Sequence, residues 1–175
     1  MIKPLPSFEF LDHMFTISNQ SPSGLSWKNS LSTKVKQGDV AGTKDKEGYW
    51  TVGITLNKTT KLFRVHRIVY ALATNTNIDN EFVDHVDGNK SNNKISNLRL
   101  ATNQQNCCNK QAQLKSTSAY KGVSWDKKCK KWRAQICINY KKIHLGTFEK
   151  ETDAAIAYNQ AAKKHHNSFA VLNND

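Results

Sequence analysis

Apolar and polar residues alternate along residues 49–56, with the period of two that a strand with one buried face requires. The apolar members of this alternation are Trp50, Val52, Ile54 and Leu56. Turn-forming residues follow at 57–60, and apolar positions return over residues 62–65. We therefore predict a β-hairpin over residues 49–66.

The spacing after this hairpin changes to that of a helix. From His66 to Thr74 the apolar residues recur three and four positions apart, so a helix is predicted there, with one face covering a small core. The pattern before the hairpin is weak, because Ser, Lys, Gly and Asn dominate from Ser18 to Gly48. Residues 1–45 are expected to form irregular structure with short strands.

A strand, a loop, a second strand and a helix are predicted in the middle of the chain. The first strand ends in Asp84-His85, and a polar loop covers residues 87–93. The second strand is expected at residues 98–100. Thr102 is a good N-cap for a helix from Asn103 to about Gln113, because its hydroxyl can accept from free amides of the first turn.

Three short strands and one more helix are predicted in the last third of the chain, after a linker at residues 113–118. The strands are expected at residues 122–125, 131–138 and 142–148, and the helix from a cap at Thr152 to about Lys164.

In the two longer strands, the alternation of apolar and polar residues predicts one buried face and one open face. The face expected to meet the alanines of the helix carries Trp132, Ala134, Ile136, Ile138, Ile143 and Leu145. The opposite face carries Arg133, Gln135, Lys142 and His144. A ribbon with such a face can enter the DNA major groove, where Arg and Lys serve phosphate or guanine and Gln pairs with adenine.

The charge distribution favours a polyanionic partner. The chain has 175 residues, enough for one ordinary domain or two small ones, and a net charge of +12. Eleven basic residues and only two acids lie between Lys110 and Lys150, and aromatic residues interleave with them. Nucleic acid is therefore the expected partner.

Several classes of protein are disfavoured by the same composition. No apolar run approaches the length of a membrane span, and the N-terminus lacks the apolar region of a secretory signal. The four cysteines form no Cys-x-x-Cys pair, so a zinc ribbon or a disulfide scaffold is not expected. A reducing compartment fits this cysteine usage best.

Asp84, His85 and Asn106 together suggest one chemistry. If the strand–loop–strand–helix order brings the end of the first strand against the start of the helix, Asp84 and Asn106 can offer oxygens to one hard cation. Mg²⁺ prefers such donors and binds one or two carboxylates together with phosphate. His85 is expected to point to the other side of the strand, where an imidazole can take a proton from water.

These residues resemble the HNH (ββα-metal) nucleases, in the version found in phage homing endonucleases. The motif is DHVDGNKSNNKISNLRLATNQQN, residues 84–106. It contains Asp-His, a Gly three residues after His85, Asn97 twelve residues after it, and a final Asn106. With its upstream leader, the resemblance covers about residues 24–110.

The resemblance implies a role for each matching residue. His85 corresponds to the general base, Asp84 and Asn106 to metal ligands, and Asn97 to the asparagine that braces the loop and orients the histidine. Many HNH enzymes have His at the last position, so Asn106 favours a single Mg²⁺ or Mn²⁺ over zinc. The asparagines of the loop, Asn93 among them, are interpreted as turn residues. Outside the motif, Arg67 is a candidate DNA contact, with a structural role at the helix start as the alternative.

Residues 119–173 resemble the AP2/ERF DNA-binding domain, which lays a three-stranded sheet in the major groove. The matching segments are YKGV, WRA, LGTF, AAIAY and AVLN, which begin at residues 120, 132, 145, 154 and 170. By alignment the DNA-contacting positions are Lys121, Ser124, Gln135, Cys137, Lys142 and His144, to which the polar face adds Arg133. Ser124, Cys137 and His144 differ from the residues that plant transcription factors have at these positions. The resemblance therefore implies the fold of the domain but not the DNA sequence that it recognises.

The predicted fold class is α+β. A ββα-metal nuclease module with an N-terminal β-hairpin region precedes an AP2-like three-stranded antiparallel sheet packed on one helix. The predicted domains are a β-rich leader at 1–60, a nuclease core at 61–112, a linker at 113–118 and the AP2-like domain at 119–173.

The predicted function is a metal-dependent, site-directed DNA endonuclease of the homing type. Its partner is double-stranded DNA, no membrane is involved, and it works in the host cytoplasm if a phage encodes it. We expect a monomer, which would nick one strand, whereas a dimer would cut both. One alternative is a DNA-binding regulator with an inactive nuclease domain, and the intact motif argues against it. Another is an RNA-binding protein, which needs stacking aromatics on an open sheet.

Overall fold

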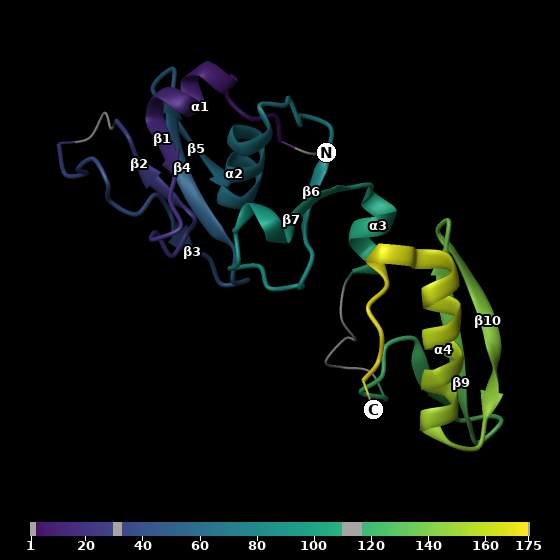
Figure 1. Cartoon of the computed structure of the whole chain (residues 1–175). Coiled ribbons are helices and arrows are strands. Elements are labelled where there is room, and N and C mark those ends of the chain that lie inside the picture. The colour runs from purple at the N-terminus through teal and green to yellow at the C-terminus, as the bar shows by residue number, and fades with distance from the viewer. Residues whose placement is uncertain (1–2, 30–32, 110–116, 175) are drawn as a thin grey trace. The chain divides into compact units, whose positions relative to one another are not determined.

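A computed structural model of the chain describes residues 3–29, 33–109 and 117–174 (Figure 1). It combines helices with short antiparallel strands, so the predicted α+β class is confirmed. The chain divides into two compact units, Met1–Ala101 and Thr102–Asp175. Each unit contains its own hydrophobic core.

The described part of the first unit contains two α-helices and small antiparallel sheets. Its helices are α1 (Phe8–Met14), α2 (Val65–Thr74) and the 3₁₀ turn η1 (Ile95–Asn97). The sheets pair β1 (Phe15–Ile17) with β2 (Leu25–Trp27), β4 (Trp50–Leu56) with β3 (Thr43–Lys44) and β5 (Thr59–Arg64), and β6 (Phe82–His85) with β7 (Leu98–Ala101).

The core of the first unit is built around α2. Its buried residues come from both helices and from strands β1, β2, β4 and β5, and they include Leu11, Phe15, Leu25, Val52, Ile54, Phe63, Val65, Ile68 and Val69. Each of these side chains is at most 4% exposed. The same packing fixes the end of β5, where the chain passes directly into α2.

The predicted hairpin and helix are confirmed as β4, β5 and α2, with a tighter turn than expected. Asn57 and Lys58 alone form the turn, with φ of 49° and 63°. Two consecutive residues with positive φ match the right-handed twist of the flanking strands, as in a type I′ turn. Thr59 and Thr60, predicted as turn residues, therefore belong to β5.

Helix α1 was not predicted. Ser7 caps it, because the Ser7 hydroxyl accepts from the amide of Phe10 at 3.3 Å. Only Leu11 and Met14 of its seven residues are buried, so its sequence contains too few apolar positions to reveal a helical period. The short strands expected in residues 1–45 are present as β1, β2 and β3.

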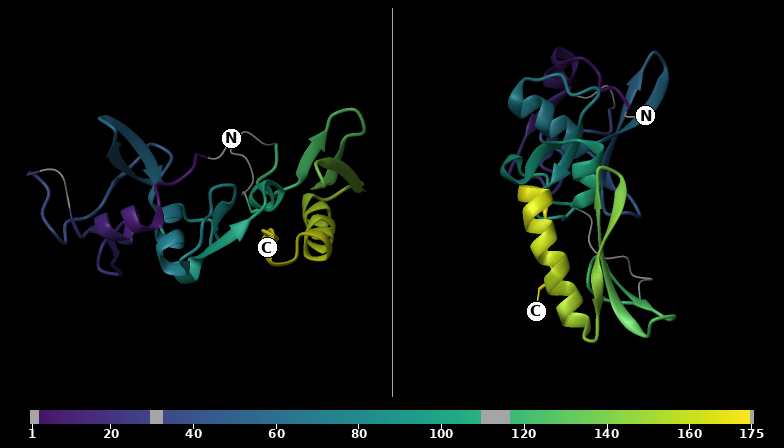
Figure 2. Two further views of the ribbon diagram at one scale, coloured as in Figure 1. Left: turned by 90° about the horizontal axis from the view of Figure 1, so that it is seen from above. Right: turned by 90° about the vertical axis from the view of Figure 1, so that its right-hand side faces the viewer.

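The second unit is a three-stranded sheet covered on one face by a helix, as predicted (Figure 2). It contains α3 (Asn103–Cys108), β8 (Val123–Asp126), β9 (Lys131–Ile138), β10 (Lys141–Phe148), α4 (Glu151–His166) and the 3₁₀ turn η2 (Asn167–Phe169). The sheet order is β10-β9-β8. Ala134, Ala154 and Ala162 are each 0% exposed, so α4 lies close on the central strand.

One residue predicted to be buried against α4 is exposed, although it pairs with the buried Ile136 and so lies on the predicted side of the sheet. Ile143 lies on the outer strand β10 and is 43% exposed. The register of β10 shifts between His144 and Gly146, so Leu145 sits at a bulge and packs on the core. The bulge thus replaces the regular alternation that the prediction assumed.

The division into units differs from the predicted domain boundaries, which stay predictions. The boundary after residue 60 falls inside β5, and α3 belongs to the second unit although it was assigned to the nuclease core. Lys121 donates a hydrogen bond to the carbonyl of Cys108 at the end of α3. The predicted end of this helix and residues 113–116 of the linker lie outside the described residues.

Candidate functional site

The β6–β7 hairpin positions the first candidate residues. Asp84 pairs with Arg99 and His85 with Leu98 across the two strands. The connecting loop leaves β6 directly after His85 and returns through η1, so candidate residues stand at both of its ends.

His85 is a buried histidine with a fixed hydrogen-bond partner. It is 5% exposed, and its Nε2 lies 3.0 Å from Oδ1 of Asn93. The Asn93 amide nitrogen donates to the carbonyl of Ser23 at 2.8 Å, so the amide oxygen faces the ring and accepts from Nε2–H. In the neutral ring this leaves the lone pair on Nδ1.

Burial keeps the His85 ring neutral. Desolvation is the largest influence and lowers the pKa of His85 below its ordinary value of 6.5, although the Asn93 hydrogen bond and nearby carboxylates oppose it. A neutral imidazole is the form that can accept a proton. The sequence prediction that Asn93 serves only as a turn residue was therefore incomplete.

Asn97 fastens the loop, in agreement with its expected bracing role. Its Nδ2 donates to Oδ1 of Asp87 at 2.9 Å and to the carbonyl of Asn92 at 2.8 Å. Its Oδ1 accepts from the Asp87 amide at 3.1 Å, and its backbone carbonyl accepts from Val86. The amide thus joins the start of the loop to its end, next to His85.

Asp84 is a buried carboxylate in an ion pair. It is 6% exposed, and its Oδ2 accepts from Nε of Arg99 at 3.0 Å, with Nη2 also at 3.0 Å. The predicted second oxygen donor, Asn106, lies on α3 in the second unit and is half-buried. The pairing of these two residues as ligands stays a prediction. In the parts of the chain that the structure describes, no three His, Cys, Asp or Glu side chains cluster as a metal site.

Aromatic rings surround His85 from the neighbouring elements. The ring of His66 lies 4.7 Å from that of His85 in an edge-on arrangement, and Tyr49 lies 5.6 Å from His66 and 6.1 Å from His85. His66 starts α2 and is buried, and this burial holds its pKa well below the ordinary value. His66 is therefore a neutral packing partner of His85.

Arg67 does not have the role predicted for it. It is 8% exposed, and its guanidinium donates to the carbonyls of Lys3 and Ile78, the latter at 2.9 Å. These bonds tie the N-terminal segment and the loop after α2 to the helix. The buried guanidinium has no open side for a DNA phosphate, so the structural alternative holds.

The predicted DNA-contacting residues of β8, β9 and β10 share one face of the sheet. Ser124 pairs with Arg133, Gln135 with His144, and Cys137 with Lys142, and residues directly opposite each other point to the same side. Cys137, Lys142 and His144 are exposed, whereas Gln135 and Arg133 are half-buried. Arg133 also lies 3.7 Å from Asp126. This side is the one opposite the buried Ala134 and Ile136.

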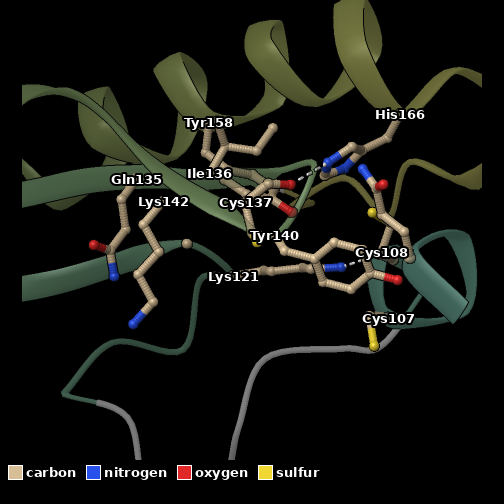
Figure 3. Close-up of a pocket in the computed structure, with 12 residues that line it drawn as sticks. Cys107, Cys108, Lys121, Gln135, Ile136, Cys137, Tyr140, Lys142, Tyr158 and His166 are labelled. Carbon is tan, nitrogen blue, oxygen red and sulfur yellow. Dashed lines mark hydrogen bonds between the residues drawn. The ribbon is translucent and has the colours of Figure 1, made fainter.

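Lys121 lies next to that surface, because Gln135, Cys137 and Lys142 line the same cavity as Lys121. Its ammonium points into a cavity of about 210 Å³ and donates to the carbonyl of Cys108, as Figure 3 shows. Burial lowers the pKa of Lys121 to about 8. The cavity is also lined by Cys107, Tyr140 and Tyr158. Lys121 is thus bonded within the second unit, and its contact with DNA stays a prediction.

Three residues near His85 were not identified from the sequence as part of its surroundings: Asn93, His66 and Tyr49. Asn93 stands eight residues after His85 within a run of loop asparagines, and His66 and Tyr49 come from a helix start and a strand entry. No spacing rule links them to His85, because the contacts arise only when β4, α2 and β6 pack together.

Comparison with known proteins confirms both resemblances. Residues 63–107 match the HNH endonuclease family and residues 118–168 match the AP2 domain family. An uncharacterized HNH endonuclease of Acanthamoeba polyphaga mimivirus is 36% identical over 111 residues, which are 63% of this chain and 57% of that protein. Protein 3.8 of Escherichia phage T7 is 38% identical over 61 residues, 35% of this chain and 50% of that protein.

Among solved structures, one titled "DNA binding and cleavage by the HNH homing endonuclease I-HmuI" is similar at a TM-score of 0.41 and 25% identity. The match covers 58% of this chain and 54% of that one. The chain thus spans about half the length of the relatives that it matches. No helix among the described residues is long and apolar enough to cross a bilayer. An HNH endonuclease domain and an AP2 domain are present in this chain.

Proposed function

From the presence of an HNH endonuclease domain and an AP2 domain in one chain, we propose that this protein is a metal-dependent, site-directed DNA endonuclease of the homing type. The observation that carries the proposal is the state of His85. Its ring is buried and hydrogen-bonded to Asn93, and burial lowers its pKa, which favours the neutral form that can accept a proton.

In this proposal His85 acts as the general base. Its Nδ1 accepts a proton from the water that attacks the phosphodiester, and the positive charge that develops on the ring is shared with the Asn93 oxygen through Nε2–H. Asn97 keeps the loop closed so that the ring does not change its orientation. Effective proton transfer needs such a fixed geometry.

Asp84 and Asn106 would hold the metal ion. A carboxylate and an amide oxygen form a hard donor set, which suits Mg²⁺ or Mn²⁺ and does not suit zinc. When bound, the ion would neutralise charge on the phosphate and on the leaving oxygen. Arg99 fixes one oxygen of Asp84 and thereby sets the orientation of the carboxylate.

The open face of the second-unit sheet is proposed to bind double-stranded DNA in the major groove. Arg133, Gln135, Lys142 and His144 lie on that face, which faces away from α4. Arg and Lys would bind phosphate or guanine, and Gln135 would pair with adenine. One active site per monomer would nick one strand, and two copies would cut both. Viral relatives support action in the cytoplasm of an infected host cell.

The test is a supercoiled-plasmid assay with Mg²⁺, on plasmids that carry phage genomic fragments. Wild type should give relaxed circles, and His85→Ala should give none while still shifting the same DNA in a gel. His165→Ala is the matched control, because His165 is an exposed histidine on α4. Chelation with EDTA should stop the wild type.

Each other outcome has a defined meaning. Linear product from wild type would indicate cleavage of both strands by a dimer or by sequential nicking. Equal nicking by wild type and His85→Ala would refute the base assignment. If neither protein nicks but both bind duplex DNA, the regulator with an inactive nuclease domain replaces the endonuclease. Preference for single-stranded RNA over duplex DNA would replace both.

A further inference from the structure

A cluster beside His85 is not explained by the general base or by the metal ligands. The ring of Tyr49 carries two cations, with the Arg64 guanidinium 4.2 Å and the Lys90 ammonium 4.8 Å from its centroid. The same ring lies 6.1 Å from that of His85. Lys90 belongs to the loop that follows His85, and a second contact docks this loop, because the Ser91 hydroxyl donates to the carbonyl of Gly48 at 3.0 Å.

The two cations differ in what neutralises them. Arg64 forms ion pairs with Asp45 and with Glu47, the latter at 3.5 Å, so its charge is compensated and its task is to fix Tyr49. Lys90 forms no ion pair with a carboxylate among the residues that the structure describes. It is also exposed, so an anion can reach it from solvent.

The position of Lys90 is restricted although its side chain is long. A lysine on the surface normally samples many rotamers, and ordering it costs conformational entropy. The face of Tyr49 attracts the ammonium and limits that freedom before any ligand arrives.

We propose that Lys90 binds a phosphate of the DNA backbone beside the bond cleaved at His85, and that Tyr49 is the platform that holds the ammonium there. This proposal rests on the proposed endonuclease function and adds to it a residue that positions the substrate. An ammonium is a compact point charge that suits a phosphate oxygen. One side of the Lys90 ammonium can rest on the Tyr49 ring while the other side contacts the phosphate.

The experiment uses the full chain and a synthetic duplex that contains a nick site mapped on the plasmid. Single-turnover nicking is measured at saturating protein for wild type, Lys90→Gln and Lys94→Gln. Lys94 lies in the same loop and is exposed, so it is the matched control. Lys90→Gln should reduce the nicking rate about tenfold or more, the worth of one charged hydrogen bond, and Lys94→Gln should not.

A second comparison separates phosphate binding from loop folding. Methylphosphonate groups replace the phosphates around the nick one at a time, which removes the charge of each. At one position, the methylphosphonate should slow nicking by the wild-type protein as much as the Lys90→Gln substitution does. The same methylphosphonate should not slow the Lys90→Gln variant further. Tyr49→Phe should keep the rate, because the ring is what holds the ammonium, whereas Tyr49→Leu should lower it.

Failure of this inference differs from failure of the proposed function. If wild type nicks and Lys90→Gln nicks equally fast, the role of Lys90 is refuted while the endonuclease stands. If every methylphosphonate slows wild type and Lys90→Gln by the same factor, Lys90 acts only on loop structure and the inference is overturned. If wild type does not nick at all, the proposed function itself fails.

Discussion

The two units differ in the exposure of their polar candidate residues. In the first unit Asp84, His85 and Asn97 are at most 9% exposed and are bonded to neighbours within the unit. In the second unit Cys137, Lys142 and His144 stand exposed on an open sheet face. The difference agrees with the two proposed tasks, because proton transfer needs groups held in one geometry, whereas recognition of a large surface needs groups that reach solvent.

This contrast makes the two units separable by experiment. Substitutions around His85 should alter the rate of cleavage with little effect on DNA affinity. Substitutions on the sheet face should alter affinity with little effect on the rate at saturating protein. A substitution that shifted both quantities equally would contradict the division of tasks.

The largest expected effect concerns the packing of the second unit. Gly122→Ala should destabilise this unit by about 2–4 kcal/mol, because Gly122 has a φ of +75° and a Cβ there would clash with the Tyr158 ring and lie 2.7 Å from the Gln135 carbonyl. Urea unfolding monitored by hydrogen exchange within residues 120–173 measures the change. Gly88→Ala, where nothing lies within 4 Å, is the control for positive φ alone. Equal losses for both variants would show that packing at Gly122 does not matter.

The next effect tests the buried network of the first unit. Asn93→Leu should lower the single-turnover nicking rate by about 10- to 100-fold, the usual range for a residue that orients a reactive group, with DNA affinity unchanged. The reason is that Nε2 of His85 loses its acceptor. Asn93→Asp keeps an acceptor and should retain more activity. A rate unaffected by Asn93→Leu would mean that the fixed tautomer is irrelevant.

The third effect tests the open face of the second unit. Arg133→Gln and Lys142→Gln should each reduce the slope of log affinity against log salt by about 0.9, because one phosphate contact is lost in each case. Fluorescence anisotropy with a labelled duplex across a salt series measures the slope. Lys164→Gln on the exposed side of α4 should leave it unchanged. An unchanged slope for both sheet variants would remove this face from DNA binding.

The last prediction concerns Lys121. Burial lowers its pKa to about 8 in the folded chain from an ordinary value of 10.5, so unfolding takes up a proton between these two pH values. The free energy of unfolding should therefore rise with pH through this window. The Lys121→Met variant should lack this rise. A rise caused by titration of the thiols would remain in that variant. Urea unfolding from pH 7.5 to 10 provides the measurement, and parallel curves would indicate that the ammonium is solvated.

Regular alternation was readable from the sequence, and packing between distant segments was not. Strand β9 was predicted with its ends, because Trp132, Ala134, Ile136 and Ile138 alternate without interruption. The side of Ile143 was predicted, since it pairs with the buried Ile136, but its exposure was not, because the sequence does not show that β10 is an edge strand. Helix α1 was missed because seven residues with two buried positions show no helical period.

In the candidate site, too, contacts between distant segments could not be predicted from the sequence. His85 and Asn97 could be predicted because their spacing lies within one short motif, and the bonds of Asn97 agree with its expected task. Arg67 was misread because a basic residue at a helix start looks like a surface contact until its guanidinium is seen to bond to Lys3 and Ile78. Asn93 was underestimated because its importance depends on Ser23, seventy residues earlier.

The hydrogen bond between Asn93 and Ser23 has a consequence for protein engineering. Because the HNH-like motif is contiguous in sequence, residues 61–112 could be fused to another DNA-binding domain. Such a graft would carry His85 and Asn93 but leave behind the Ser23 carbonyl that orients the Asn93 amide. It would also leave behind Tyr49 and Gly48, on which the loop after His85 rests. The smallest transferable form of the proposed nuclease therefore begins before Ser23.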